Sequence, residues 1–171
     1  METEHLDELK TALREERPES WDRIPDIDLY MDQVIAYLKR QHIGFLPEVG
    51  DEQLTSSMIN NYIKSGVMPR AHGKRYDREH IGYLTAIALL KQVFSVSETG
   101  DLLKELTESS GVAGFYDRYS RVVDEEYTRV ADLLEGKKEP EELSELALRL
   151  AVSSYAERLA ARMILKDLVK K

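Results

Sequence analysis

The sequence contains no cysteine, only five prolines and nine glycines, and no long apolar run. Without cysteine the chain has no disulfide, no thiol nucleophile and no thiolate metal site. The scarcity of proline and glycine predicts a mostly helical, all-α fold. Because no stretch of about 18 apolar residues occurs, we expect no transmembrane helix. The acidic start METEHLDELK lacks the basic and apolar parts of a secretory signal, so we expect a cytoplasmic location.

Basic residues are also in the minority, since the 171 residues carry a formal net charge of −8. Such acidity argues against general coating of nucleic acid, which usually requires a basic excess. The charge is unevenly distributed, however. Residues 1–53 hold 6 Lys or Arg against 14 Asp or Glu, a net charge of −8, whereas residues 54–78 hold 5 against 1, a net charge of +4. The basic patch is therefore local.

Catalytic and metal-binding patterns are scarce. Glu2 with His5, and Asp77 with His80, have the spacing of ligands on one helix face. A di-iron bundle needs several inward carboxylates on facing helices, and Asp77 is better explained as a helix cap. No zinc-protease, phosphate-loop or dinucleotide-binding motif occurs. We therefore expect a protein that is not an enzyme and that needs no metal or cofactor.

The first third of the chain predicts two short helices. Residues 4–17 place Leu6, Leu9 and Leu13 at helical spacing until Pro18 ends the pattern. The connector that follows contains Trp21, which we interpret as a packing residue. A second helix is expected from about 29 to 38, and the glycine and proline residues of segment 42–53 predict a loop.

Segment 54–66, LTSSMINNYIKSG, predicts a helix with two distinct faces. Thr55 is a plausible N-cap and Gly66 a plausible left-handed stop, with Pro69 just beyond. One face carries apolar side chains and the other carries only hydroxyls, amides and the cation Lys64. Residues 67–76 then predict a small hairpin, or wing, around Ala71-His72-Gly73.

The remainder predicts longer helices. Asp77 caps a helix from about 78 to 93, and Ser95 with Glu98 forms a capping-box pattern that starts the next one. The sequence SSGVAG, at 109–114, breaks the pattern. Apolar residues then recur at spacings of three and four residues along two stretches, one on each side of EGKKEPEE at 135–142. This pattern predicts an antiparallel helical hairpin. Such a hairpin leaves apolar surface that either a homodimer or folding back on the N-terminal part would cover.

The order of elements between 54 and 103 resembles the winged helix-turn-helix of MerR-type regulators. In that family a Y-x-x-x-G-L-[IL]-x-P helix is followed by a G-Y-R-x-Y wing, a further helix and a G-[FY]-S-[LI]-x-E-I turn. The matching positions are Tyr62, Gly66, Val67, Pro69, Gly73, Arg75, Tyr76 and the segment 94–98. The resemblance implies a winged module of about 50 residues, and MerR-type regulators dimerise through C-terminal helices.

Three segments also look like the signature of the bacterial domain-of-unknown-function 1836 family. They are IPDIDLYMDQVIAYL at 24–38, LTSSMINNYIKSGVMP at 54–69 and KRYDREHIGYLTAIALLKQVFSVSE at 74–98. The resemblance spans about 20–105 and implies a fold but no activity. One feature departs from a compact helix-turn-helix, in which 3–4 residues join the two helices. About a dozen residues separate Leu38 from Leu54 here.

The leading hypothesis is a non-catalytic transcriptional regulator that binds double-stranded DNA. Asn60 and Asn61 would face base edges, since an amide can pair bidentately with adenine. Phosphate contacts would come from Ser56, Ser57 and Lys64 on the helix and from Arg70, Lys74 and Arg75 on the wing. The alternative is a protein-interaction module on a winged scaffold that does not bind DNA. No residue identifies a small-molecule effector.

The predicted organisation has three parts. Residues 1–23 form an amphipathic helix and connector, residues 24–106 a MerR-like winged helix-turn-helix module, and residues 107–171 a C-terminal helical hairpin. A monomeric winged helix reads one short site, whereas a two-fold dimer reads two half-sites and gains affinity from their linkage. We therefore expect a homodimer built chiefly on residues 114–171.

Overall fold

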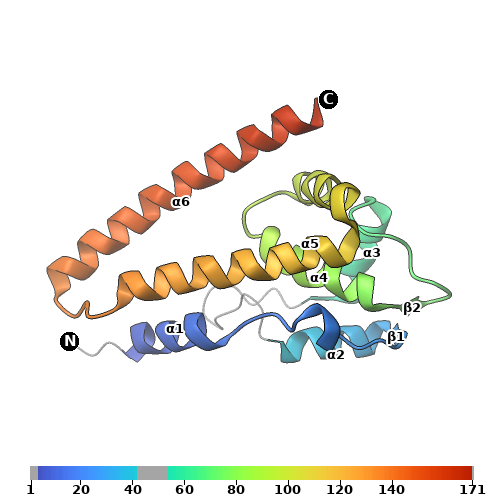
Figure 1. Cartoon of the computed structure of the whole chain (residues 1–171), viewed down its shortest axis with the longest axis horizontal. Helices are drawn as coiled ribbons and strands as arrows, with labels where there is room; N and C mark the ends of the chain where they lie inside the picture. The colour runs from blue at the N-terminus through green and yellow to red at the C-terminus, as the bar shows by residue number, and fades with distance from the viewer. Residues whose placement is uncertain (1–3, 42–53, 171) are drawn as a thin grey trace. The chain divides into compact units, whose positions relative to one another are not determined.

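The computed structural model describes residues 4–41 and 54–170 (Figure 1). The predicted loop at 42–53 and the acidic side chain of Glu2 lie outside the described residues. The elements in chain order are α1 (Glu4–Glu15), a 3₁₀ turn η1 (Trp21–Arg23), β1 (Leu29–Tyr30), α2 (Met31–Arg40), α3 (Ser56–Lys64), β2 (Arg75–Tyr76), α4 (Arg78–Leu90), α5 (Val96–Leu134) and α6 (Pro140–Val169). The described residues are therefore mostly helical, as the composition predicts, and they include one small antiparallel sheet.

The chain divides into two compact units. One comprises residues 17–123, and the other combines residues 1–16 with 124–171. The first unit contains the whole predicted winged module and extends beyond it to Val123. The second groups α1 with the end of α5 and with α6. These bounds follow compactness in space and differ from the three consecutive segments expected from the sequence.

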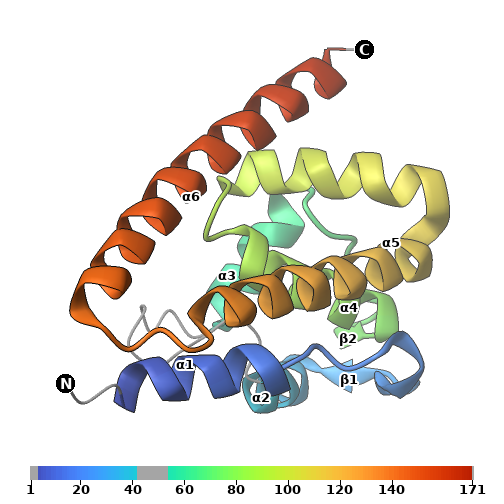
Figure 2. The same cartoon turned by 60° about the vertical axis from the view of Figure 1, so that its left-hand side comes forward.

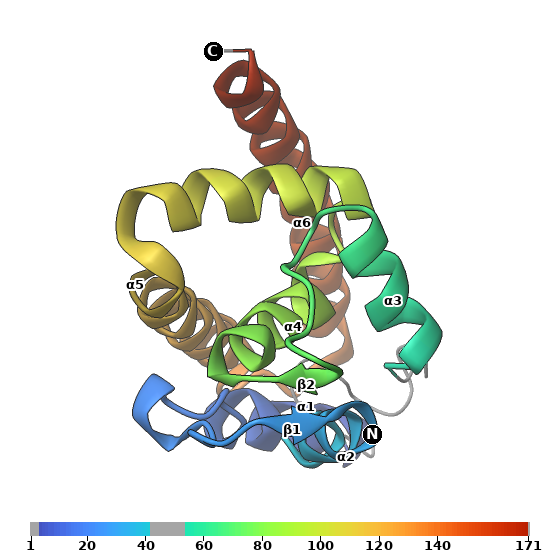
Figure 3. The same cartoon turned by 90° about the vertical axis from the view of Figure 1, so that its right-hand side faces the viewer.

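Unit 17–123 contains a two-stranded sheet that the sequence did not predict. Leu29 pairs with Tyr76 and Tyr30 with Arg75 in antiparallel register (Figure 3). Residues 29–30 were expected to begin the second helix, but they are extended and the helix starts at Met31. The strand that partners Arg75–Tyr76 therefore comes from before α2, and the expected pairing within 67–76 is reduced to one bridge between His72 and Arg75.

The predicted start and end of α3 and the predicted start of α4 are confirmed, whereas α4 ends at Leu90 and not near residue 93. The Thr55 hydroxyl accepts a hydrogen bond from the Met58 amide at 3.2 Å, which satisfies a free N–H of the first turn. Gly66, with φ of 73°, ends α3 in the left-handed conformation. The Asp77 carboxylate accepts from the His80 amide at 3.1 Å and so caps α4. Local sequence thus fixes both ends of the segment that connects the two helices.

The core of unit 17–123 forms where α2, α3, α4 and β2 meet, with α2 in contact with each of the other three. Its largest fully buried side chains include Ile24, Val34, Ile59, Ile81, Leu84, Ile87, Leu103, Phe115 and Tyr116. Trp21 packs as predicted, with its ring centroid 5.6 Å from that of Tyr116. The Tyr116 hydroxyl donates to the Glu19 carbonyl at 2.8 Å, which fastens the connector to the helices. The core thereby holds α3 in a fixed orientation within this unit.

Helix α5 consists of two helices separated at Gly111, whose φ of 68° and ψ of 177° are not helical. The predicted break at SSGVAG is therefore confirmed. Glycine suits this position because an L side chain rarely adopts positive φ. The Arg118 guanidinium donates to the Leu106 carbonyl and the Ser110 hydroxyl, at 2.8 and 2.7 Å, and thereby satisfies groups at the end of the first helix.

The second unit contains α1, the last turns of α5 and α6. Helix α1 lies alongside the end of α5, and α6 leaves the short connection at 135–139 at an angle to those turns (Figures 1 and 2). Arg14 of α1 pairs with Asp132 at 2.8 Å. Helix α6 buries Leu146 and Leu165 but exposes many other apolar side chains. Over residues 4–41 and 54–170, no helix has the length and apolarity needed to span a bilayer.

Candidate nucleic-acid interface

Helix α3 has the two faces that its sequence predicts. Ile59 and Tyr62 are 0% and 3% exposed and anchor the helix in the core. The opposite face carries the five predicted side chains, all of which are exposed: Ser56, Ser57, Asn60, Asn61 and Lys64. This face contains hydroxyl, amide and ammonium groups and no carboxylate. Its groups can donate hydrogen bonds to phosphate oxygens, and the two amides can also pair with base edges.

The segment after α3 adds three more predicted cations, Arg70, Lys74 and Arg75, and all three are exposed. Among the described residues, no carboxylate lies within 4 Å of these side chains or of Lys64. The Arg75 guanidinium instead donates to the Tyr30 hydroxyl at 3.2 Å and lies 5.1 Å from the centre of its ring. Four cations without acidic partners among the described residues therefore lie between residues 64 and 75 of an acidic chain.

Segment 67–76 contains a two-residue turn. His72 and Arg75 exchange backbone hydrogen bonds of 2.9 and 3.0 Å, and the two residues between them, Gly73 and Lys74, have φ of 57° and 68°. Positive φ at both central positions is the type I′ geometry of tight hairpins. Positive φ at Gly73 is as predicted, but the tip is Gly73-Lys74 and not Ala71-His72-Gly73. The turn therefore presents the Lys74 side chain at its apex.

A buried histidine connects this turn to α4. His80 is 1% exposed, and its Nδ1 lies 2.7 Å from Asp77 Oδ1 while its Nε2 lies 3.1 Å from the Arg70 carbonyl oxygen. The rings of Tyr76 and His72 pack edge-on against it, at 5.4 and 5.6 Å. One side chain thus joins both ends of segment 70–77 to the start of α4. It restrains the backbone that carries the basic residues.

The same contacts shift the ionisation of Asp77. Its partial burial opposes the charged form, but hydrogen bonds from the backbone and ring of His80, with the nearby His80 and His72 charges, outweigh burial. The pKa of Asp77 is therefore lower than its ordinary value. Of the described residues, no three His, Asp or Glu side chains gather as a metal-ligand set. The Asp77–His80 pair thus has an observed structural task, which is capping and bracing.

A cleft adjoins the C-terminal end of α3. It has a volume of about 840 Å³ and lies between segment 63–70, α4 and the first part of α5. Lys64 and Arg70 line one part of it, and Glu79 and Asp101 line another. No local sequence pattern predicts this cleft, because its walls come from three separated segments. Its mixed charge and open form favour no particular ligand class.

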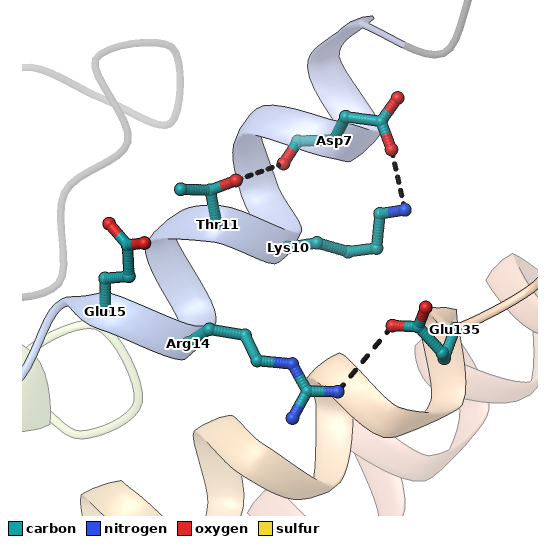
Figure 4. Close-up of a pocket in the computed structure, with 6 residues that line it drawn as sticks. All are labelled: Asp7, Lys10, Thr11, Arg14, Glu15 and Glu135. Carbon is teal, nitrogen blue, oxygen red and sulfur yellow. Dashed lines mark hydrogen bonds and ion pairs between the residues drawn. The ribbon is translucent and has the colours of Figure 1, made fainter.

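A second hollow, of about 320 Å³, lies between α1 and the end of α5 (Figure 4). Its cations already have acidic partners: Lys10 lies 2.6 Å from Asp7, and Arg14 lies 2.8 Å from Asp132 and 3.7 Å from Glu135. The hydrogen bond that Lys10 donates to the Asp7 carboxylate is the largest factor that raises the pKa of Lys10. The Arg14–Asp132 pair links α1 to α5, and the pairing of both cations leaves this hollow a poorer anion site than the α3 surface.

Two contributors to the α3 surface were missed from sequence. Tyr30 was assigned to a helix, although it lies in β1 and supports Arg75. His80 was considered only as a metal ligand, although its three-residue spacing from Asp77 is also that of a capping box. That spacing was the available signal for His80. Nothing local to Tyr30 indicates that it lies beside residue 75.

Comparison with protein families identifies the unit that carries this surface. Residues 19–119 match the family model described as a domain of unknown function, DUF1836. The chain belongs to this family. The matched region nearly coincides with compact unit 17–123, so the DUF1836 domain includes α3, segment 67–76, the Gly111 break and the start of the second part of α5. No curated protein and no solved structure matches the chain.

Proposed function

We propose that the DUF1836 domain of this protein binds double-stranded DNA and acts as a non-catalytic transcriptional regulator of the winged-helix type. Helix α3 enters the major groove with Asn60 and Asn61 toward base edges. Ser56, Ser57 and Lys64 contact phosphates, and Arg70, Lys74 and Arg75 grip the backbone beside the groove. Phosphate contacts position such a protein, whereas base contacts give it sequence preference.

The observation that carries the proposal is the pairing state of the cations. Several bases elsewhere in the described chain have close acidic partners, as in Arg14–Asp132, Arg78–Asp26 and Arg129–Glu126. Lys64, Arg70, Lys74 and Arg75 have none among the described carboxylates, and the outer face of α3 carries no acid. Exposed cations without acidic partners are available to neutralise DNA phosphates. This neutralisation releases the counterions condensed on the DNA, which favours binding. The chain is acidic overall, but the acid-free outer face of α3 includes Lys64, and the three other cations follow it in the chain.

The resemblance to MerR-type winged modules adds support. The short helix α3, its glycine stop, the tight basic turn, the capped helix α4 and the capping box at Ser95–Glu98 follow one another in the same order. The two-stranded sheet between β1 and β2 places the turn beside α2 and α4. A turn held in this position could place Lys74 and Arg75 against the DNA backbone while α3 lies in the groove.

The test measures binding to a random-sequence duplex by fluorescence anisotropy over a range of salt concentrations. The variant Arg70→Gln/Lys74→Asn removes two charges, and Asn is chosen because it tolerates the positive φ at position 74. We expect weaker binding on every sequence, and a slope of log K against log salt that falls by about two units, one per lost phosphate contact.

The control is Lys138→Asn/Arg158→Gln, which makes the same charge change at exposed positions of the other unit. It should leave the slope within the error of wild type. Equal losses in both variants would reduce the effect to net charge and contradict the assigned surface. Absence of duplex binding by the wild-type protein at low salt would favour the alternative, a protein-interaction module on the same scaffold.

A further inference from the structure

Helix α6 presents an apolar stripe to solvent on the side opposite its buried residues. The stripe consists of Leu148, Val152, Tyr155, Leu159 and Met163, which are 66%, 61%, 62%, 50% and 50% exposed. Their spacing of four, three, four and four residues places them on one helix face. Leu146 and Leu165, the buried residues of α6, lie away from this face. Five large apolar side chains in a row exceed the scattered exposure of an ordinary surface, which marks an interaction site.

The two ends of the stripe carry opposite charges. The same face continues through Glu145 and Glu141 toward the N-terminus and through Lys166 and Lys170 toward the C-terminus. Among the described residues, neither Lys166 nor Lys170 has a carboxylate within 4 Å, and the Glu141 side chain has no basic partner. Glu145 has one exposed contact, with Arg149 at 3.6 Å. Among the described residues, Glu141 at one end and the two lysines at the other thus lack a partner of opposite charge, which calls for a partner surface with the reverse arrangement.

A second copy of α6 has that reverse arrangement when it runs antiparallel. We infer that two chains associate through this stripe about a two-fold axis near Tyr155. The apolar residues of one copy then meet those of the other in reverse order. Each acidic end, Glu141 and Glu145, faces the lysine end of the other copy. A parallel pair would instead place acids against acids and lysines against lysines, which is destabilising. The antiparallel arrangement is an isologous interface, the usual form of a homodimer.

This inference specifies the helix, the face and the orientation, beyond the general expectation of a dimer on residues 114–171. It does not depend on DNA binding, so its test uses the protein alone. Light scattering on the full chain should give twice 19.7 kDa at micromolar concentration. The variant Leu148→Glu/Leu159→Glu should be a monomer with wild-type helicity by circular dichroism. The control Ala147→Glu/Ser154→Glu adds the same charge at exposed positions off the stripe and should remain a dimer.

Cross-linking tests the orientation without relying on the glutamate variants. The chain has no cysteine, so each introduced cysteine is the sole thiol. In the antiparallel pair, Tyr155→Cys lies near the axis and should form an intermolecular disulfide under mild oxidation. The two Glu141 positions lie about 40 Å apart at 1.5 Å per residue, so Glu141→Cys alone should not cross-link. A mixture of Glu141→Cys and Lys170→Cys chains should cross-link.

Three results would overturn the inference. A wild-type chain that stays monomeric at high micromolar concentration would show that the stripe is covered within one chain or left open. Self-cross-linking of Glu141→Cys would show a parallel pair. Loss of the dimer in the off-stripe control, with retention in the stripe variant, would move the interface to another surface.

Discussion

Helices α3 and α6 are both amphipathic in the sense that each buries one face, yet they differ in what they present outward. The outer face of α3 carries hydroxyls, amides and an ammonium group, while that of α6 carries leucine, valine, tyrosine and methionine. A hydrated, acid-free face suits the phosphates and base edges of DNA. An apolar face gains free energy only when another apolar surface removes it from water. The same secondary structure thus points to two different partners.

The surroundings of the two helices differ in the same way. Helix α3 is held by a core of buried side chains, a capping threonine and the restrained turn at 72–75. Helix α6 extends for 30 residues and buries only two of them. A rigid support suits precise contacts to bases, since misplacement of an amide loses its bidentate geometry. A long exposed helix gains stability when another surface covers its apolar face, because most helical stability in proteins comes from the packing of such a face.

The largest expected effect is a loss of folding free energy when the buried face of α3 is truncated, compared with the same kind of truncation on the outer face of α6. Ile59→Ala removes a side chain that is 0% exposed and should lower the free energy of unfolding by about 2–5 kcal/mol at every protein concentration. Leu159→Ala changes a half-exposed residue and should cost less than about 0.5 kcal/mol where the chain is monomeric. Chemical denaturation followed by circular dichroism at several concentrations measures both.

The dependence of the denaturation midpoint on protein concentration tests the role of the outer face of α6. A dimer that forms through α6 makes the wild-type midpoint rise with protein concentration, because association stabilises the folded state. Leu159→Ala should reduce that rise, and Ile59→Ala should leave it unchanged. If both variants lowered the midpoint equally at all concentrations, the outer face of α6 would be part of the monomer core.

A smaller effect tests the contact between Asp77 and His80, which restrains the segment after α3. Because the pKa of Asp77 is lowered in the folded chain, its ionised form stabilises the fold. This contribution is fully present above pH about 4, the ordinary range of the group, and is lost as the pH falls through the lower folded value. Asp77→Asn keeps a capping side chain but cannot ionise. Its cost at pH 7 should stay below about 1 kcal/mol, since the carboxylate is 35% exposed and partly screened.

The pH profile distinguishes the charge from the cap. The difference in unfolding free energy between wild type and Asp77→Asn should shrink as the pH is lowered below about 4. Asp77→Ala removes the cap as well and should cost about 0.5–2 kcal/mol at every pH. A difference for Asp77→Asn that is constant from pH 7 to pH 3 would show that the contacts to His80 do not act through the carboxylate charge.

Features governed by neighbouring residues could be predicted from the sequence. Thr55, Gly66, Asp77 and the Ser95–Glu98 box mark helix ends because each side chain or glycine acts within four residues of its own position. The division of α3 into two faces also follows from local periodicity. These features were sufficient to place all eight candidate DNA-contacting side chains on exposed positions.

Features that depend on distant partners could not be predicted. The strand at Leu29–Tyr30 exists because Arg75–Tyr76, more than 40 residues later, pairs with it. The position of His80 between Asp77 and the Arg70 carbonyl likewise requires the turn at 72–75 to fold back on α4. The exposed stripe of α6 was hidden in the sequence, because periodic apolar residues on two faces of one helix do not reveal which face is buried.

The most direct test of the account is whether the two amides of α3 determine a sequence preference. Selection from a random duplex library with the wild-type protein should yield a preferred site. The variants Asn60→Ala and Asn61→Ala should each lose preference at one base position, by about 1–3 kcal/mol, while they retain wild-type affinity for random duplex. Circular dichroism would verify that both remain folded. The account would be contradicted if the wild-type protein bound duplex DNA and the selected site, including every base preference, were unchanged in both variants.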